Sequence, residues 1–238
     1  MLDAVVFAII LLFSHVPIAA QDPICEVQDA KISWGFKESF RSYVSGSIAD
    51  GEWATSGDVS YATPIFEFSH GRGILGEKLH NGEVRFDGGI QFTGHSGILN
   101  TSLAQPVLRI DGPGQATLFL NVRGQTMDNH EVDRERVAFA VALWESSSQV
   151  FSSDGLEWSV KDAVVHLTDS GAKSFGTYGP REPMDPMSFF IRVGDGCDVE
   201  IPLQGSLLAG YVTACFFAVA ILSLAIREDR KLPEPAQS

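Results

Sequence analysis

Hydrophobic residues near the start of the chain follow the period of an α-helix. The residues that recur every four positions are Phe36, Phe40, Val44 and Ile48. That spacing places one apolar stripe along a helix. Ser33 stands where an N-cap is expected, because a serine hydroxyl accepts hydrogen bonds from the free N–H groups of the first turn. Asp50-Gly51 supplies a C-terminal stop, so the pattern predicts a helix that opens at Ser33 and ends before Gly51.

Beyond Gly51 the hydrophobic period changes to two, the alternation that β-strands produce. The predicted strands cover Val84 to Phe86, Ile90 to Phe92, Val107 to Ile110, Ala116 to Val122, Val137 to Leu143 and Trp158 to Leu167. Glycine-containing turn signals occur at Asn81-Gly82, Asp111-Gly112, Asp154-Gly155 and Asp195-Gly196. Gly88-Gly89 within a strand region indicates a bulge. We expect a β-rich fold, a β-sandwich or barrel-like, with the leading helix and a second short helix near Lys173 to Tyr178.

The start of the chain has the pattern of a secretory signal peptide. Val5 to Phe13 is a short apolar run, and small residues precede the polar Gln21 and Asp22. Asp3 departs from the pattern, because signal peptides carry positive charge ahead of the apolar run. We expect residues 1–20 to be a signal peptide and the domain at 21–204 to be extracytoplasmic.

The end of the chain has the pattern of a transmembrane helix. Leu207 to Ile226 contains no charged residue, and a helix of this length crosses a hydrocarbon core of about 30 Å. A buried core helix is the alternative. The basic residues Arg227, Arg230 and Lys231 follow at once and favour a stop-transfer flank that stays in the cytoplasm. We expect a transmembrane helix at 205–226, a cytoplasmic tail at 227–238 and a single-pass protein of the cell membrane.

Charge and cysteine content narrow the possible partners and the compartment. The formal net charge is −13, which repels nucleic acid and excludes it as a partner. Cys25 and Cys197 lie just inside the two ends of the 21–204 domain. In an oxidising compartment such a pair is expected to form a disulfide. Cys215 lies in the predicted span and is interpreted as a small apolar residue.

Motifs for common enzymes fail on their spacing or context. Gly71 to Gly76 matches the dinucleotide pattern G-x-G-x-x-G, but Asn81-Gly82 follows too soon for the helix that the motif needs. A hairpin loop is predicted there. Gly94 to Gly97 lacks the G-x-S-x-G spacing of a nucleophile elbow, and the histidines show no zinc-ligand spacing. The chain is therefore predicted not to be an enzyme.

One group of residues on the leading helix remains as a candidate site. Ser39 and Tyr43 are four residues apart, so their hydroxyls lie on one helix face with Phe40 beside them. From periodicity alone, Tyr43 marks the edge of the core and its hydroxyl finds an ordinary hydrogen-bond partner. Taken alone, His95 after Gly94 is an ordinary turn or core histidine. Neither residue defines a site by itself.

Three sequence blocks resemble the HtaA domain, a family of actinobacterial surface haem proteins. Trp34 to Val44 (WGFKESFRSYV) resembles its opening W-G-x-K-x-S-F-x-x-Y-V. Val84 to Leu99 is similar to its F-x-G-x-V-x-F-x-G-H-x-G-x-L stretch, and Leu167 to Pro186 is similar to its closing block. The resemblance covers essentially all of the 21–204 domain.

The resemblance implies a haem site and the role of each residue in it. In the family an axial tyrosine holds the iron, a histidine hydrogen-bonds that tyrosine, and a serine and a later tyrosine meet the propionates. Carried over, these are Tyr43, His95, Ser39 and Tyr178, with Phe40 as a further cofactor-binding residue. At Tyr178 this chain departs from the pattern, because Tyr178 stands one residue nearer to Phe175 and is followed by Pro180 to Pro183.

The chemistry of these side chains suits ferric haem b. A phenolate is a hard anionic ligand for Fe(III), and a histidine that donates to its oxygen favours the anion, as does the charge of the iron. Serine and tyrosine hydroxyls are neutral donors for propionates. Arg41 and Arg72 are expected to be solvated surface residues. The methionines Met127, Met184 and Met187 are expected in the core or in loops, not as a sixth ligand.

The resemblance and the predicted transmembrane helix together imply a haem acceptor and relay at the cell surface. The donor would be a related surface haem protein or a host haemoprotein, and the acceptor a haem ABC importer or its binding protein. A structural or adhesive surface module with the same fold and no haem is the alternative. A haem enzyme is disfavoured because no acid or base besides His95 can be named near Tyr43.

Overall fold

The structure, a computed structural model, describes residues 24–76, 78–125, 131–152, 155–176, 178–194 and 197. The predicted signal peptide, transmembrane helix and cytoplasmic tail lie outside these residues, as do the predicted turn at Asp195-Gly196, Met127 and Cys215. Within the described ranges, no helix has both the length and the apolar character needed to cross a membrane.

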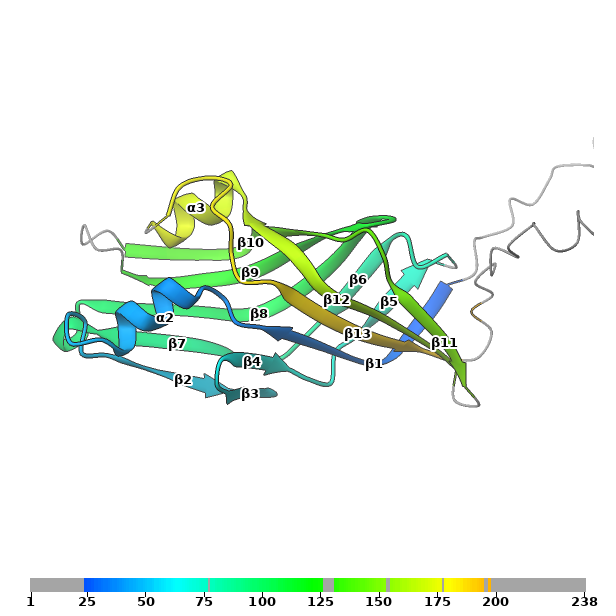
Figure 1. Cartoon of the computed structure of the whole chain (residues 1–238), viewed down its shortest axis with the longest axis horizontal. Helices are drawn as coiled ribbons and strands as arrows, with labels where there is room; N and C mark the ends of the chain where they lie inside the picture. Colours follow the sequence, from blue (N-terminus) through cyan, green and yellow to red (C-terminus); the bar gives the residue numbers. More distant parts are fainter. Residues whose placement is uncertain are drawn as a thin grey trace, which may run out of the picture. The chain divides into compact units, whose positions relative to one another are not determined.

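The described chain consists mainly of strands, with two short helices (Figure 1). The strands are β1 Ile24–Trp34, β2 Glu52–Ser56, β3 Val59–Ala62, β4 Ile65–Phe68, β5 Arg72–Gly76, β6 Gly82–Arg85, β7 Gly89–Gly94, β8 Leu99–Gly112, β9 Gln115–Gln125, β10 Glu131–Leu143, β11 Ser148–Ser152, β12 Gly155–Leu167 and β13 Met187–Val193. The helices are α2 Glu38–Ser45 and α3 Asp169–Phe175, and η1 His95–Gly97 is a single 3-10 turn. This confirms the predicted β-rich fold with two short helices.

Antiparallel pairing closes eight of the described strands into a ring. The hydrogen-bonded neighbours run β1, β5, β6, β8, β9, β10, β12 and β13, and β13 pairs again with β1. At one end the long strands β1 and β8 take additional partners, because β4 pairs with β1 and β7 pairs with β8. Helices α2 and α3 lie toward this same end of the strands in Figure 1.

The end of the sheet that carries the helices is filled by aromatic side chains. The buried rings in contact there belong to Phe36, Phe40, Phe92, Phe139 and Phe175. Their centroids lie 4.9–6.2 Å apart where they touch, for example 4.9 Å between Phe40 and Phe175. Offset and edge-on contacts of this kind stabilise more than their buried area alone. The cluster fixes α2 and α3 against the same strands.

Helix α2 begins five residues later than the hydrophobic pattern predicts. Ser33 is not an N-cap but part of β1, where it pairs with Ser188 and Glu67. Phe36 has φ 66°, a left-handed conformation that an α-helix cannot include. The helix therefore starts at Glu38. Ile48 is 76% exposed, so the buried stripe ends at Val44. Sheet pairing on both sides of β1 outweighs the local helical period.

Three further local predictions differ from the structure in detail. Residues 72–76 of the G-x-G-x-x-G segment form strand β5, not a hairpin loop, and β5 pairs with both β1 and β6. The second helix lies at Asp169–Phe175, ahead of the predicted position. Thr168 caps its start through a hydrogen bond from Gly171 N–H, and Gly176 ends it with φ 73°. The predicted bulge at Gly88-Gly89 is the break between β6 and β7, which both pair with β8.

The two ends of the described domain are joined covalently. Cys25 and Cys197 form a disulfide with Cα atoms 5.4 Å apart, which confirms the predicted pairing. Met184 and Met187 are buried in the core, as expected.

Candidate functional site

Helix α2 carries the candidate residues Ser39 and Tyr43 outside the side that it buries in the core. Phe40, Arg41 and Val44 are buried on the inner side. Ser39 is exposed and Tyr43 is half-buried. Their spacing of four residues places the two hydroxyls about one turn, roughly 6 Å, apart along the helix. Packing of the inner side therefore decides which hydroxyls face outward.

An ion pair anchors the beginning of this helix. The Arg41 guanidinium donates to the Asp185 carboxylate at 2.6 Å and to the Gly35 carbonyl oxygen. The other Asp185 oxygen accepts a hydrogen bond from Glu38 N–H at 2.9 Å and so caps the helix from a distant segment. The Trp34 indole donates to the Asp185 carbonyl oxygen at 2.8 Å. Arg41, expected at the surface, is 7% exposed because its charge is paired in the interior.

The pairing of β2 with β7 brings Tyr43 and His95 to the same place. Helix α2 runs into β2, and β7 runs into η1, which begins at His95. Strands β2 and β7 are antiparallel, with Glu52 opposite Thr93. The segment before Glu52 and the segment after Thr93 therefore lie at the same end of the strand pair. His95 N–H donates to the Ala49 carbonyl oxygen at 2.6 Å. His95 and Ser96 have φ 49° and 54°, so the turn is sharp and directs the imidazole back toward the helix.

The phenol oxygen of Tyr43 lies 2.5 Å from His95 Nε2. The two groups share one hydrogen between them, and its position depends on the tautomer and charge of the imidazole. A phenol donates to a neutral Nε2, whereas a phenolate accepts from Nε2–H. Both side chains are half-buried, so a ligand approaching from outside can reach the oxygen. The pair is suited to present an anionic oxygen with a donor at its side.

A second pair of hydroxyls lies one helical turn away. Ser39 Oγ is 3.2 Å from the Tyr178 hydroxyl. Tyr178 is held by stacking on Phe175, with ring centroids 6.0 Å apart and planes 9° from parallel. The Lys37 ammonium lies over the Tyr178 ring, 5.0 Å from its centroid. Tyr178 thus lies next to Ser39, although it stands one residue nearer to Phe175 than in the family pattern.

Phe40 occupies a different position from the other candidates. Its side chain is 1% exposed and packs between Phe36, Phe92 and Phe175. Its ring centroid is 6.4 Å from that of Tyr43. Phe40 thus lies beneath the tyrosine in the core, and it positions the helix instead of forming the outer surface of the site.

Sequence reasoning did not identify the residues that hold the site in place. Asp185 anchors α2, and Lys37 covers Tyr178 while pairing with Glu182 at 2.9 Å. The only sequence signal for Asp185 was its place in the Asp185-Pro186 element of the closing block. Its partners Glu38 and Arg41 lie 147 and 144 residues away, and no local pattern reveals such a contact.

Fold and sequence together identify the family. The family model of the HtaA domain matches residues 29–190. The chain therefore belongs to the HtaA family. No curated protein sequence matches the chain.

Solved structures of HtaA domains have the same fold. The C-terminal domain of HtaA from Corynebacterium glutamicum is 30% identical with a TM-score of 0.63, and the match covers 71% of this chain and 99% of that domain. The N-terminal domain of the same protein is 24% identical with a TM-score of 0.59, covering 71% and 98%. The haem-binding protein HtaB of that organism is 17% identical with a TM-score of 0.53, covering 73% and 96%. The last two similarities concern the fold alone.

Proposed function

We propose that this protein binds ferric haem b at the cell surface through Tyr43 and passes it toward an importer. The observation that carries the proposal is the 2.5 Å contact between the Tyr43 oxygen and His95 Nε2. Membership of the HtaA family supports it.

Each side chain of this site has its own role in holding haem. Ferric iron supplies the Lewis acid to which a phenolate oxygen binds. Tyr43 must lose its proton to become that ligand, and His95 Nε2, in hydrogen-bond contact with the oxygen, is the group that takes it up. The resulting imidazolium donates to the phenolate and stabilises its charge. Return of this proton to the tyrosine oxygen weakens the ligand, which suits transfer better than permanent storage.

Ser39 and Tyr178 are the proposed donors to the haem propionates. Their hydroxyls form a neutral pair one turn from Tyr43, on the same outer side of the helix. Lys37 adds a positive charge beside Tyr178. In a chain with a formal net charge of −13, this local arrangement lets carboxylates approach. A flat molecule with iron at its centre and acids at one edge fits both pairs at once.

The place of the protein in the cell is part of the same proposal. The apolar segment 205–226 and its basic flank support a membrane anchor with the 21–204 domain outside and the 227–238 tail inside. From this position the domain would receive haem from a related surface protein or a host haemoprotein. It would deliver haem to an ABC importer or its binding protein.

Titration of the full chain with hemin tests the proposal. We expect a saturable Soret band at one haem per chain and a charge-transfer band typical of tyrosinate-bound Fe(III). Tyr43→Ala should lose both, while Tyr61→Phe, which changes a tyrosine packed against Trp53 elsewhere, should keep them. No saturable band in the folded wild-type chain would contradict haem binding and favour a structural or adhesive module.

A further inference from the structure

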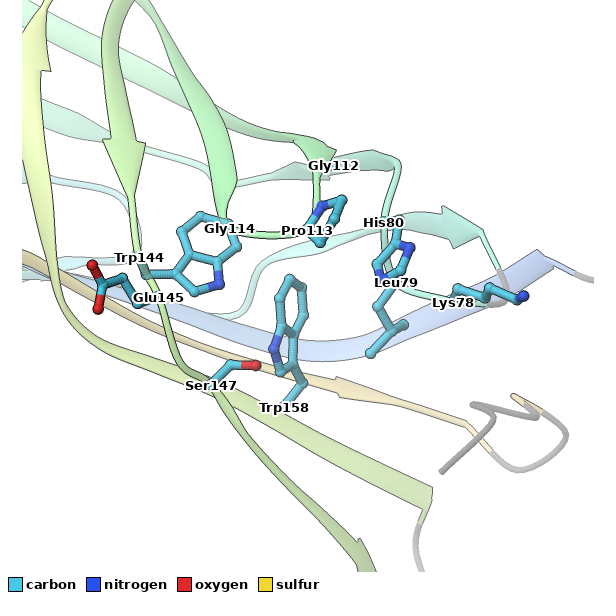
Figure 2. Close-up of a pocket in the computed structure, with 10 residues that line it drawn as sticks. All are labelled: Lys78, Leu79, His80, Gly112, Pro113, Gly114, Trp144, Glu145, Ser147 and Trp158. Carbon is cyan, nitrogen blue, oxygen red and sulfur yellow. The ribbon is translucent and has the colours of Figure 1, made fainter. Parts of the chain in front are cut away.

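A cavity of about 230 Å³ lies at the end of the sheet opposite to Tyr43. Its residues come from the connection between β5 and β6, the turn between β8 and β9, the chain after β10, and strand β12 (Figure 2). Strand β8 runs from Leu99, beside η1, to Gly112 in the cavity wall. At about 3.3 Å per residue these 14 residues separate the two places by roughly 40 Å. The cavity is therefore not part of the proposed haem site.

The floor of this cavity is apolar but contains one polar atom without a partner. Leu79 and Trp158 are 2% and 4% exposed. The indole nitrogen Nε1 of Trp158 is buried and makes no hydrogen bond within the described structure. In Figure 2 this nitrogen lies on the side of the ring toward Ser147 and Trp144. A buried donor without an acceptor costs free energy, which a ligand supplying an acceptor would recover.

The backbone beneath the floor is held in an uncommon conformation. Leu79 has φ 55°, in the left-handed region that non-glycine residues rarely adopt. The Leu79 N–H donates to the Gly76 carbonyl oxygen at 2.8 Å, which closes the turn after β5. In this conformation the leucine side chain is buried, with 2% of the residue exposed. Such conformations persist where the surroundings impose them, often at ligand sites.

The wall and rim determine the chemistry of a ligand. Trp144 is half-buried beside the cavity, with its ring centroid 6.1 Å from that of Trp158, and offers a flat apolar face. The exposed rim carries Glu145 as an acceptor, with His80 and Ser147 able to donate. Lys78 adds a positive charge. Opposite charges and neutral donors around one opening favour a neutral ligand with several hydroxyls over an ion of one sign.

We infer that this cavity binds an N-acetylated amino sugar, free or at the end of a glycan. The apolar face of a pyranose ring would stack on Trp144 while its hydroxyls meet the rim. The acetamido carbonyl oxygen would accept the Trp158 indole hydrogen, and its methyl group would contact Leu79. Drug-sized pockets measure about 300–1,000 Å³, so a cavity of about 230 Å³ suits one sugar ring.

The indole N–H resonances of the full chain provide a direct test. The chain has four tryptophans, and Trp158→Phe identifies the resonance of Trp158 by its loss. We expect titration with N-acetylglucosamine to shift the Trp158 resonance saturably. Glucose, which lacks the acetamido group, should bind at least about fivefold more weakly, because one neutral hydrogen bond and the methyl contact with Leu79 are missing. The proposal is wrong if the Trp158 resonance does not shift, or if both sugars bind equally.

Three variants connect the binding to these residues. Trp158→Phe keeps the ring but not the donor, so N-acetylglucosamine should bind it about fivefold more weakly than it binds the wild type, whereas the affinity for glucose should not change. Trp144→Ala removes the stacking face and should abolish binding of both sugars. Trp53→Phe, a half-buried tryptophan that packs against Tyr61 far from the cavity, should bind like the wild type. Unchanged affinity in Trp158→Phe would overturn the assignment of the donor even if the sugar binds.

Discussion

The Arg41 guanidinium lies 2.6 Å from the Asp185 carboxylate and joins helix α2 to the segment before β13 across 144 residues. The side chains of Arg41 and Asp185 are 9% and 23% exposed. The same carboxylate accepts from Glu38 N–H at the first turn of the helix. A single aspartate thus satisfies a buried charge and a helix end that has no cap from its own residues. The position of Tyr43 depends on both contacts.

Asp185→Ala should destabilise the domain strongly. It leaves the Arg41 charge without its carboxylate, and breaking a buried ion pair costs about 3–5 kcal/mol. Urea unfolding should show a loss at the low end of this range, because the Asp185 side chain is 23% exposed. Asp185→Asn is the matched control: it removes the negative charge that pairs with Arg41, but its amide oxygen still accepts from Glu38 N–H. A loss of stability in Asp185→Ala no larger than that of an average surface substitution would show that the ion pair is unimportant.

His95→Ala should weaken haem binding without abolishing it. It removes the hydrogen bond to the Tyr43 oxygen but keeps the oxygen ligand. A hydrogen bond to a charged group contributes about 1.5–3 kcal/mol, which is about 10- to 100-fold in affinity. Hemin titration should show this decrease together with shifted charge-transfer bands. His70→Ala, at an exposed histidine, is the control. Complete loss in His95→Ala with a normal spectrum in Tyr43→Ala would mean that histidine is the ligand.

Ser39→Ala and Tyr178→Phe should each lower haem affinity about fivefold, because each removes one neutral hydrogen bond of about 1 kcal/mol. The two oxygens lie 3.2 Å apart, so their effects should not be additive. The double variant, measured by hemin titration as a double-mutant cycle, gives the coupling between them. Additive losses would indicate that the two hydroxyls do not act on the same group.

Removal of the Cys25–Cys197 disulfide should lower stability by up to about 5 kcal/mol in the chain-entropy model for a long loop. The bond closes a separation of 172 residues. Urea unfolding of Cys25→Ser/Cys197→Ser compared with the wild type measures the effect, and the reduced wild-type protein should match the double variant. Haem affinity should change little, because Cys25 is at the far end of β1 from α2. Equal unfolding midpoints would contradict the prediction.

Local sequence was sufficient for long strands rich in apolar residues, even where their pairing is irregular, as between Ala138 and Ala140 or between Val160 and Ala163. Val137 to Leu143 and Trp158 to Leu167 lie within β10 and β12 as predicted. Strand β1 was missed because it has few strongly apolar residues and its buried residues also change phase: Cys25 and Val27 are followed by Ala30 and Ile32, across an irregularity between Val27 and Asp29. A bulge displaces the alternation by one residue, so the simple period no longer describes the strand.

The sequence by itself predicted the β-rich class, the disulfide pair and, through the family motifs, the candidate site residues Tyr43, His95, Ser39 and Tyr178. The sequence did not determine that Tyr43 contacts His95 or that Ser39 contacts Tyr178. Tyr43 and His95 are 52 residues apart, and Ser39 and Tyr178 are 139 apart. Their contacts follow from the register of β2 on β7 and from the aromatic packing that fixes α2 and α3. Only tertiary structure decides such contacts, because they depend on pairing and packing between segments that have no local sequence relation.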